Sequence, residues 1–113
     1  MSDGEETPPD YHLLLEAAEV PVAASALRLI LSDEAHQPVI QGIGREVLQG
    51  LQAAPDERGR ITLALSAPQM KITHSAVRLL IKDLQREQAD EREILWRILE
   101  KLPDEHVMRA IEL

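Results

Sequence analysis

The chain has 113 residues with a net charge of −8, one Trp, one Tyr, no Phe and no Cys. The lack of cysteine excludes a disulfide framework, thiol catalysis and thiolate metal sites, and the acidic balance disfavours nucleic-acid binding by the chain as a whole. The N-terminus is polar and acidic, whereas a signal peptide begins with basic residues followed by an apolar stretch. No apolar run approaches the length of a membrane span, which is about 20 residues. We therefore expect a cytoplasmic protein with an aliphatic core and no membrane segment.

The first residues, 1–9, are small, polar and acidic. They predict a disordered tail, because they cannot bury enough apolar area to offset the entropy lost on ordering. Residues 10–113 are expected to form a single helical domain. Within it, Asp10 is a suitable N-cap for a short helix that carries three leucines and ends near Glu19.

Two further helices are predicted in the first half of the chain. One begins at Pro21, runs to about Glu34 and is apolar nearly all round, which is typical of a helix buried on more than one side. The other begins at Pro38 and runs to about Ala54. Glycines in an otherwise good helix indicate the close approach of a neighbour, and this helix contains Gly42, Gly44 and Gly50.

The hydrophobic period changes from helical to alternating over residues 60–66, which predicts a short β-strand. A single strand leaves its backbone groups unpaired, so this one needs a partner. The C-terminal segment, 104–113, also alternates and is the candidate inside the chain. However, Pro103 followed by two acidic residues equally predicts a helix there. The remaining possibility is pairing across a dimer.

The longest predicted element covers residues 66–102. Ser66 and Gln69 form a capping-box signature at its start. This element has an apolar segment at each end and a polar segment between them. On a helical wheel the apolar residues of both ends fall on the same face, which favours one continuous helix of about 50 Å. The alternative is a helical hairpin with Asp90 as the second N-cap. The fold class is therefore mainly α: a single helical domain with one long C-terminal helix, or a hairpin, and one short strand.

A continuous helix of that length would extend beyond what the shorter helices can cover. Its uncovered apolar end predicts a homodimer in which two such helices pair antiparallel. The residues assigned to this interface are Ile94, Leu95, Trp96, Ile98, Leu99 and Leu102. Trp96 points away from the apolar face, so it is either an interface anchor or covered by the C-terminal segment through Met108 or Ile111.

A basic stripe without an intervening acid is predicted along one side of the same element. It consists of Lys71, Arg78, Lys82 and Arg86, with His74 and Ser75 beside them. Like charges at this spacing repel one another, so a compensating partner is expected. The first interpretation is a solvated surface, and the second is docking of the acidic N-terminal half of the chain or of an acidic partner surface. Nucleic acid is third, because the aromatic residues of a single-strand binder are missing.

Catalytic and metal-binding signatures are incomplete. None of the histidines, at positions 12, 36, 74 and 106, has the spacing that places two ligands on one helix face. A motif of helicase-type ATPases is matched in sequence by Asp33-Glu34-Ala35-His36. The chain has no phosphate-binding loop to accompany it, so the match does not indicate an ATPase. Glu87 and Glu91 are four residues apart, and water or arginines across an interface explain them better than acid–base chemistry. We assign no catalytic residue, no metal and no cofactor.

Together these observations predict a non-catalytic protein–protein interaction or regulatory module that is homodimeric through the long helix. The first alternative is a nucleic-acid-associated transcriptional regulator that uses the basic stripe. The second alternative is a small metal-dependent enzyme.

Overall fold

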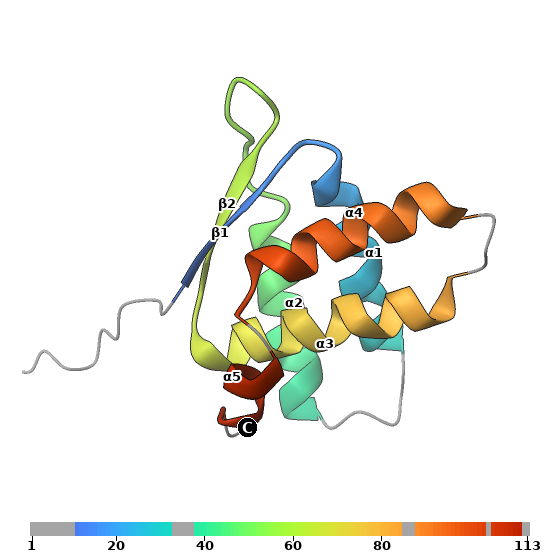
Figure 1. Ribbon diagram of the computed structural model, residues 1–113. Coiled ribbons are helices and arrows are strands. Elements are labelled where there is room, and N and C mark those ends of the chain that lie inside the picture. Colours follow the sequence, from blue (N-terminus) through green and yellow to red (C-terminus); the bar gives the residue numbers. More distant parts are fainter. Residues whose placement is uncertain (1–10, 33–37, 85–87, 104, 112–113) are drawn as a thin grey trace, which may run out of the picture.

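The computed structural model describes residues 11–32, 38–84, 88–103 and 105–111 (Figure 1). In chain order these residues form β1 (Tyr11–Leu15), α1 (Glu19–Ser32), α2 (Pro38–Gly50), β2 (Ile61–Leu65), α3 (Ala67–Asp83), α4 (Ala89–Lys101) and α5 (Glu105–Arg109). The described part of the chain is thus mainly helical, as predicted, with one small two-stranded sheet. The predicted acidic tail, 1–9, lies outside the described residues.

The predicted strand is confirmed as β2, and it pairs antiparallel with β1 in a register that places Leu13 opposite Leu63. Its partner is therefore neither the C-terminal segment nor, along this edge, a second chain. Alternate residues of both strands are buried on the side of the sheet that faces the helices. The sheet in this way closes one side of the aliphatic core (Figure 1).

The helix expected from Asp10 to Glu19 is wrong, because its central part is the strand β1. Leu13 and Leu15 are buried, whereas Leu14 between them is 40% exposed. A run of three leucines fits a helical and an alternating period equally well. Residues 11–15 form a strand because they pair with β2, which lies far along the chain. A local sequence pattern does not contain this pairing and so could not distinguish strand from helix.

The helix α1 is the centre of the core, since it packs against α2, α3 and α4. Its buried residues are spread around the helix as predicted for a helix with neighbours on several sides. They are Glu19, Val22, Ala23, Ala24, Ala26, Leu27 and Ile30.

The helix α2 begins at Pro38 as predicted but ends at Gly50, before the predicted end at Ala54. Close approach explains Gly50, whereas a side chain at Gly44 would make only an ordinary contact with α1. A Cβ on Gly50 would lie 2.9 Å from the side chain of Leu63 in β2, and a Cβ on Gly44 would lie 3.4 Å from α1. Nothing lies within 4 Å of a Cβ built on Gly42, so the prediction of a close neighbour is wrong there.

The predicted start of the long element is confirmed. The hydroxyl oxygen of Ser66 accepts a hydrogen bond from the Gln69 backbone N–H, and the Gln69 side chain accepts one from the Ser66 backbone N–H. This reciprocal capping box satisfies two donors that have no intrahelical partner. It fixes the direction in which α3 leaves the sheet.

The continuous helix is wrong, and the helical hairpin is the observed arrangement. Leu84 ends α3 in an extended conformation, with φ −75° and ψ 143°. The next helix, α4, has Gln88 rather than Asp90 as its N-cap, without a side-chain capping bond. The Arg92 guanidinium donates to the Leu84 carbonyl oxygen at 2.8 Å and ties the end of α3 to α4.

The apolar residues of the two helices, α3 and α4, have the same helical phase because both helices face one shared core. Val77 on α3 is 1% exposed, and Leu95 and Ile98 on α4 are 0% exposed. Both helices pack against α1 as well as against each other. Each helix therefore orients its own apolar side toward the core, and agreement in phase does not require one unbroken helix.

The C-terminal segment contains the helix α5, so the helix alternative is right and the strand alternative is wrong. Met108 on this helix is buried. Beyond it, the Lys71 ammonium group donates to the Ile111 carbonyl oxygen at 2.6 Å. These contacts hold the segment against α3.

The turn that leads into β2 is organised by Asp56. Its carboxylate accepts hydrogen bonds of 2.8 Å from the backbone N–H groups of Arg58 and Arg60 and from the Arg60 guanidinium. These bonds, above all the one from the Arg60 N–H, lower the pKa of Asp56 below its usual value. Gly59 completes the turn at a φ of 79° and lies against Ala17.

We predict that Gly59→Ala destabilises the fold by at least about 1–2 kcal/mol, because an L-residue is strained at this φ. The new Cβ would also lie only 2.9 Å from the Ala17 Cβ. Gly42→Ala is the matched control. It lies in open space inside a helix and should stabilise the protein by about 0.5–1 kcal/mol. Urea denaturation of both variants measures the difference, and a Gly59→Ala variant as stable as the unmodified chain would contradict the argument.

Candidate functional site

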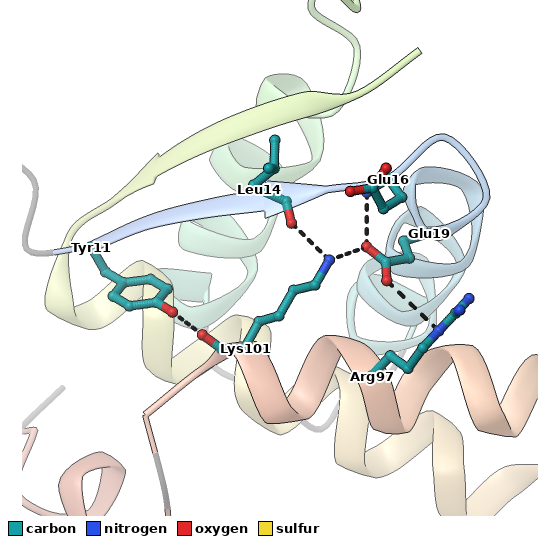
Figure 2. A network of polar contacts seen from close by, with 6 residues as sticks. All are labelled: Tyr11, Leu14, Glu16, Glu19, Arg97 and Lys101. Carbon is teal, nitrogen blue, oxygen red and sulfur yellow. Dashed lines mark hydrogen bonds and ion pairs between the residues drawn. The ribbon is translucent and has the colours of Figure 1, made fainter. Parts of the chain in front are cut away.

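The first candidate is a network of polar contacts around Glu19, the first residue of α1 (Figure 2). The Glu19 carboxylate is 2% exposed, which is rare for an acid unless it is paired. Its Oε1 lies 2.5 Å from the Lys101 ammonium and accepts a hydrogen bond from the Glu16 backbone N–H at 2.8 Å. Its Oε2 lies 3.9 Å from the Arg97 guanidinium.

Lys101, the last residue of α4, also makes contacts outside this ion pair. Its ammonium group donates to the Leu14 carbonyl oxygen at 2.9 Å, and its own carbonyl oxygen accepts a hydrogen bond from the Tyr11 hydroxyl (Figure 2). The network therefore joins β1, the start of α1 and the end of α4. Its central groups are already engaged with one another, so the arrangement stabilises the fold rather than presenting a reactive group to a ligand.

We predict that Lys101→Met destabilises the fold by about 2 kcal/mol. Breaking a fully buried ion pair costs about 3–5 kcal/mol, and the loss is smaller here because water reaches the lysine. Arg97→Met is the matched control. Its guanidinium is more distant and 53% exposed, so the loss should stay below about 1 kcal/mol. Adding Glu19→Gln to Lys101→Met should restore part of the lost stability, because the uncompensated charge is then removed.

Chemical denaturation at neutral pH measures all three variants. Equal losses for Lys101→Met and Arg97→Met would show that the short ion pair is not special.

The second candidate is a groove between α3 and α5, which we call the cationic groove. Its residues from α3 recur every three or four positions and so lie along one side of the helix. The groove has a volume of about 360 Å³ and is lined by Lys71, His74, Ser75, Arg78, Leu79, Lys82, Met108 and Arg109. Its lining thus includes four cationic side chains, a histidine and a hydroxyl, with no carboxylate among the described lining residues.

A second hollow adjoins the cationic groove and shares His74 and Arg78 with it. We call it the Trp96 hollow. It measures about 510 Å³ and is lined by His74, Arg78, Trp96, Leu99, Glu100, Leu102 and Pro103. Trp96 is 50% exposed. An apolar surface with a half-exposed indole therefore continues directly into a cationic one.

This combination suits an extended ligand with two chemical features. Lysine and arginine side chains favour carboxylate or phosphate groups, while the indole and the leucines favour an apolar side chain. Tryptophan and arginine, which both line the Trp96 hollow, are also residue types that contribute often to binding energy at protein interfaces. The geometry thus fits recognition by surface contact.

Three of the four residues of the predicted basic stripe, Lys71, Arg78 and Lys82, line the cationic groove. The fourth, Arg86, lies outside the described residues. Lys71 also holds the C-terminal segment through its bond to the Ile111 carbonyl, so it has a structural role as well.

The interface predicted for the long helix is wrong in part. Leu95, Ile98 and Leu102 belong to the core of the single chain, with exposed fractions of 0%, 0% and 6%. Ile94 and Leu99 are partly buried against that core. The hairpin covers these residues within one chain, so they form no exposed stripe for a second copy. Trp96 remains half exposed, which excludes full cover by the C-terminal segment.

Sequence reasoning missed the places of Arg109 and Met108 in the cationic groove and the buried state of Glu19. Arg109 and Met108 reach the cationic groove only because α5 folds back along α3. Glu19 is buried only because the end of α4 brings Lys101 to it. Each of these contacts joins parts of the chain that are distant in sequence, so no local pattern could have predicted them.

Among the described residues, no three His, Asp or Glu side chains come together in a way that could hold a metal ion. His12 and His106 are exposed, His74 is 6% exposed, and His36 lies outside the described residues. Gln88 donates to Glu91 at the surface at 3.4 Å, while Glu87 is not described. No helix in the described part of the chain combines the length and the apolar character needed to cross a bilayer.

Comparison of the chain with protein-family models, with curated proteins and with solved structures gave no match.

Proposed function

We propose that the protein is a non-catalytic protein-interaction module and that the cationic groove, together with the Trp96 hollow, is its docking surface. The observation that carries the proposal is the meeting of these two surfaces at His74 and Arg78. The partner is an acidic protein segment that carries at least one large apolar side chain. Its carboxylates pair with the cations of α3 and α5, and its apolar side chain packs on Trp96.

The mixed chemistry of the surface supports a protein partner over nucleic acid. A nucleic-acid site needs several cations along a phosphate backbone, and a single-strand site adds a series of stacking aromatics. Here one indole lies beside leucines and a proline.

Trp96 provides the test, because it is the only tryptophan in the chain and lies on the proposed surface. We expect a peptide of alternating Glu and Leu to change the Trp96 emission and to bind more weakly as salt is raised. A Lys and Leu peptide of the same length should produce no change. Charge reversal by Arg78→Glu with Lys82→Glu should weaken binding of the acidic peptide by at least about tenfold, mainly through a slower association rate.

Arg45→Glu is the matched control, because Arg45 is exposed on α2 outside the groove. It changes the net charge in the same direction, so its affinity should stay close to that of the unmodified chain. An acidic peptide that binds equally well to the doubly reversed variant would contradict the proposal. Tight binding of duplex DNA by the unmodified chain, with a steep fall on adding salt, would instead favour the transcriptional regulator.

Homodimerisation and a cytoplasmic location stay predictions. The helix-mediated interface is no longer their basis, since its central residues belong to the core of one chain.

A further inference from the structure

One edge of the two-stranded sheet is blocked. On the outer edge of β1, the Leu14 carbonyl oxygen accepts a hydrogen bond from the Lys101 ammonium at 2.9 Å. Figure 2 shows this oxygen pointing away from β2 and toward the end of α4. A charged side chain at a strand edge is a common device that prevents another strand from pairing there.

The direction of the Leu14 carbonyl also determines where the backbone groups of β2 point. In an antiparallel ladder, opposite residues either exchange both hydrogen bonds or direct both N–H and C=O outward. Leu14 lies opposite Thr62, and His12 lies opposite Ala64. Because the Leu14 carbonyl points outward, the pairs Leu14–Thr62 and His12–Ala64 are the non-hydrogen-bonded ones. The N–H and C=O groups of Thr62 and Ala64 therefore point to the outer edge of β2.

That outer edge has no corresponding block. Within the described part of the chain, no side chain and no backbone group outside the β1 ladder bonds to the backbone of Ile61–Leu65. The strand itself contains neither lysine nor proline. Unpaired backbone groups along an apolar strand favour the addition of another strand, and a two-stranded sheet is only marginally stable alone.

We propose that the outer edge of β2 pairs with β2 of a second copy of this chain, antiparallel and with the two-fold axis at Leu63. Thr62 of one copy then lies opposite Ala64 of the other, and each such pair exchanges two hydrogen bonds. The result is one continuous four-stranded sheet with the order β1, β2, β2 and β1. It buries the free backbone groups of both copies without changing either β1 ladder.

The pattern of β2 matches that of a second copy in an antiparallel arrangement. From Ile61 to Leu65 its residues are alternately buried and exposed, and the pattern is the same when read in either direction. An antiparallel copy centred on Leu63 therefore places buried residues beside buried ones and exposed residues beside exposed ones. The two outward-pointing residues, Thr62 and Ala64, lie symmetrically about the same centre, so one axis satisfies both.

This interface is independent of the proposed docking surface. The cationic groove lies on α3 and α5, whereas the edge belongs to β2. Either proposal can fail without the other. Pairing through backbone hydrogen bonds is also largely insensitive to salt, unlike docking on the cationic groove.

Light scattering of the unmodified chain and of two proline variants tests the proposal. Ala64→Pro removes an outward N–H from the β2 edge, and His12→Pro removes the N–H of the residue opposite it on the β1 edge. Both changes leave the ladder between the strands intact, since proline is tolerated at strand edges where its nitrogen faces outward. We expect the unmodified chain and His12→Pro to have the mass of a dimer, which is twice the 12.6 kDa of one chain. Ala64→Pro should have the mass of a single chain and an unchanged circular dichroism spectrum.

A monomeric unmodified chain at the highest concentration at which it stays soluble would overturn the proposal. A dimer that persists in Ala64→Pro would overturn it as well.

Amide hydrogen exchange measured by NMR on the unmodified chain decides the matter if Ala64→Pro fails to fold. In the dimer, the Thr62 and Ala64 amides should be protected together with those of Ile61 and Leu63. Dilution to the monomer should remove the protection of Thr62 and Ala64 selectively. Thr62 and Ala64 amides that exchange freely at every concentration would overturn the proposal and leave this edge to a strand of another protein.

Discussion

The ammonium group of Lys101 connects segments that lie far apart in the sequence. It pairs with the Glu19 carboxylate at 2.5 Å and donates to the Leu14 carbonyl oxygen at 2.9 Å. Glu19 is almost completely buried, and leaving its carboxylate without the Lys101 ammonium should cost the fold about 2 kcal/mol. The end of α4 must therefore lie against the end of β1 and the start of α1. That requirement determines how the helical hairpin packs on the rest of the chain.

The position of α4 explains which side chains are left for binding. Leu95 and Ile98 fill the core beside α1 and α3, so the opposite side of α4 carries Trp96 at the surface. On α3 the burial of Val77 likewise leaves Arg78 and Lys82 in the cationic groove. A helix that buries one side necessarily presents the other. The proposed docking surface is thus a direct consequence of how the hairpin packs.

The two surfaces available for association differ in their physical chemistry. The proposed docking surface combines the charge of the cationic groove with the indole of the Trp96 hollow, so it would favour a partner of opposite charge and respond to salt. The β2 edge acts through backbone hydrogen bonds and a self-matching pattern, so it favours an identical strand. Lys101 blocks the β1 edge, so the proposed association along the sheet uses the edge of β2.

The sequence alone determined the features that depend on neighbouring residues. The helical class, the strand β2, the capping box of Ser66 and Gln69, and the alignment of Lys71, Arg78 and Lys82 all follow from local period and local hydrogen bonding. Only the tertiary structure decided that residues 11–15 form a strand and that 66–102 is a hairpin. It also decided that Leu95 and Ile98 are core and that Arg109 joins the cationic groove. The reason is common to all four: the free energy that selects each arrangement comes from contacts with residues distant in sequence, which a local pattern does not contain.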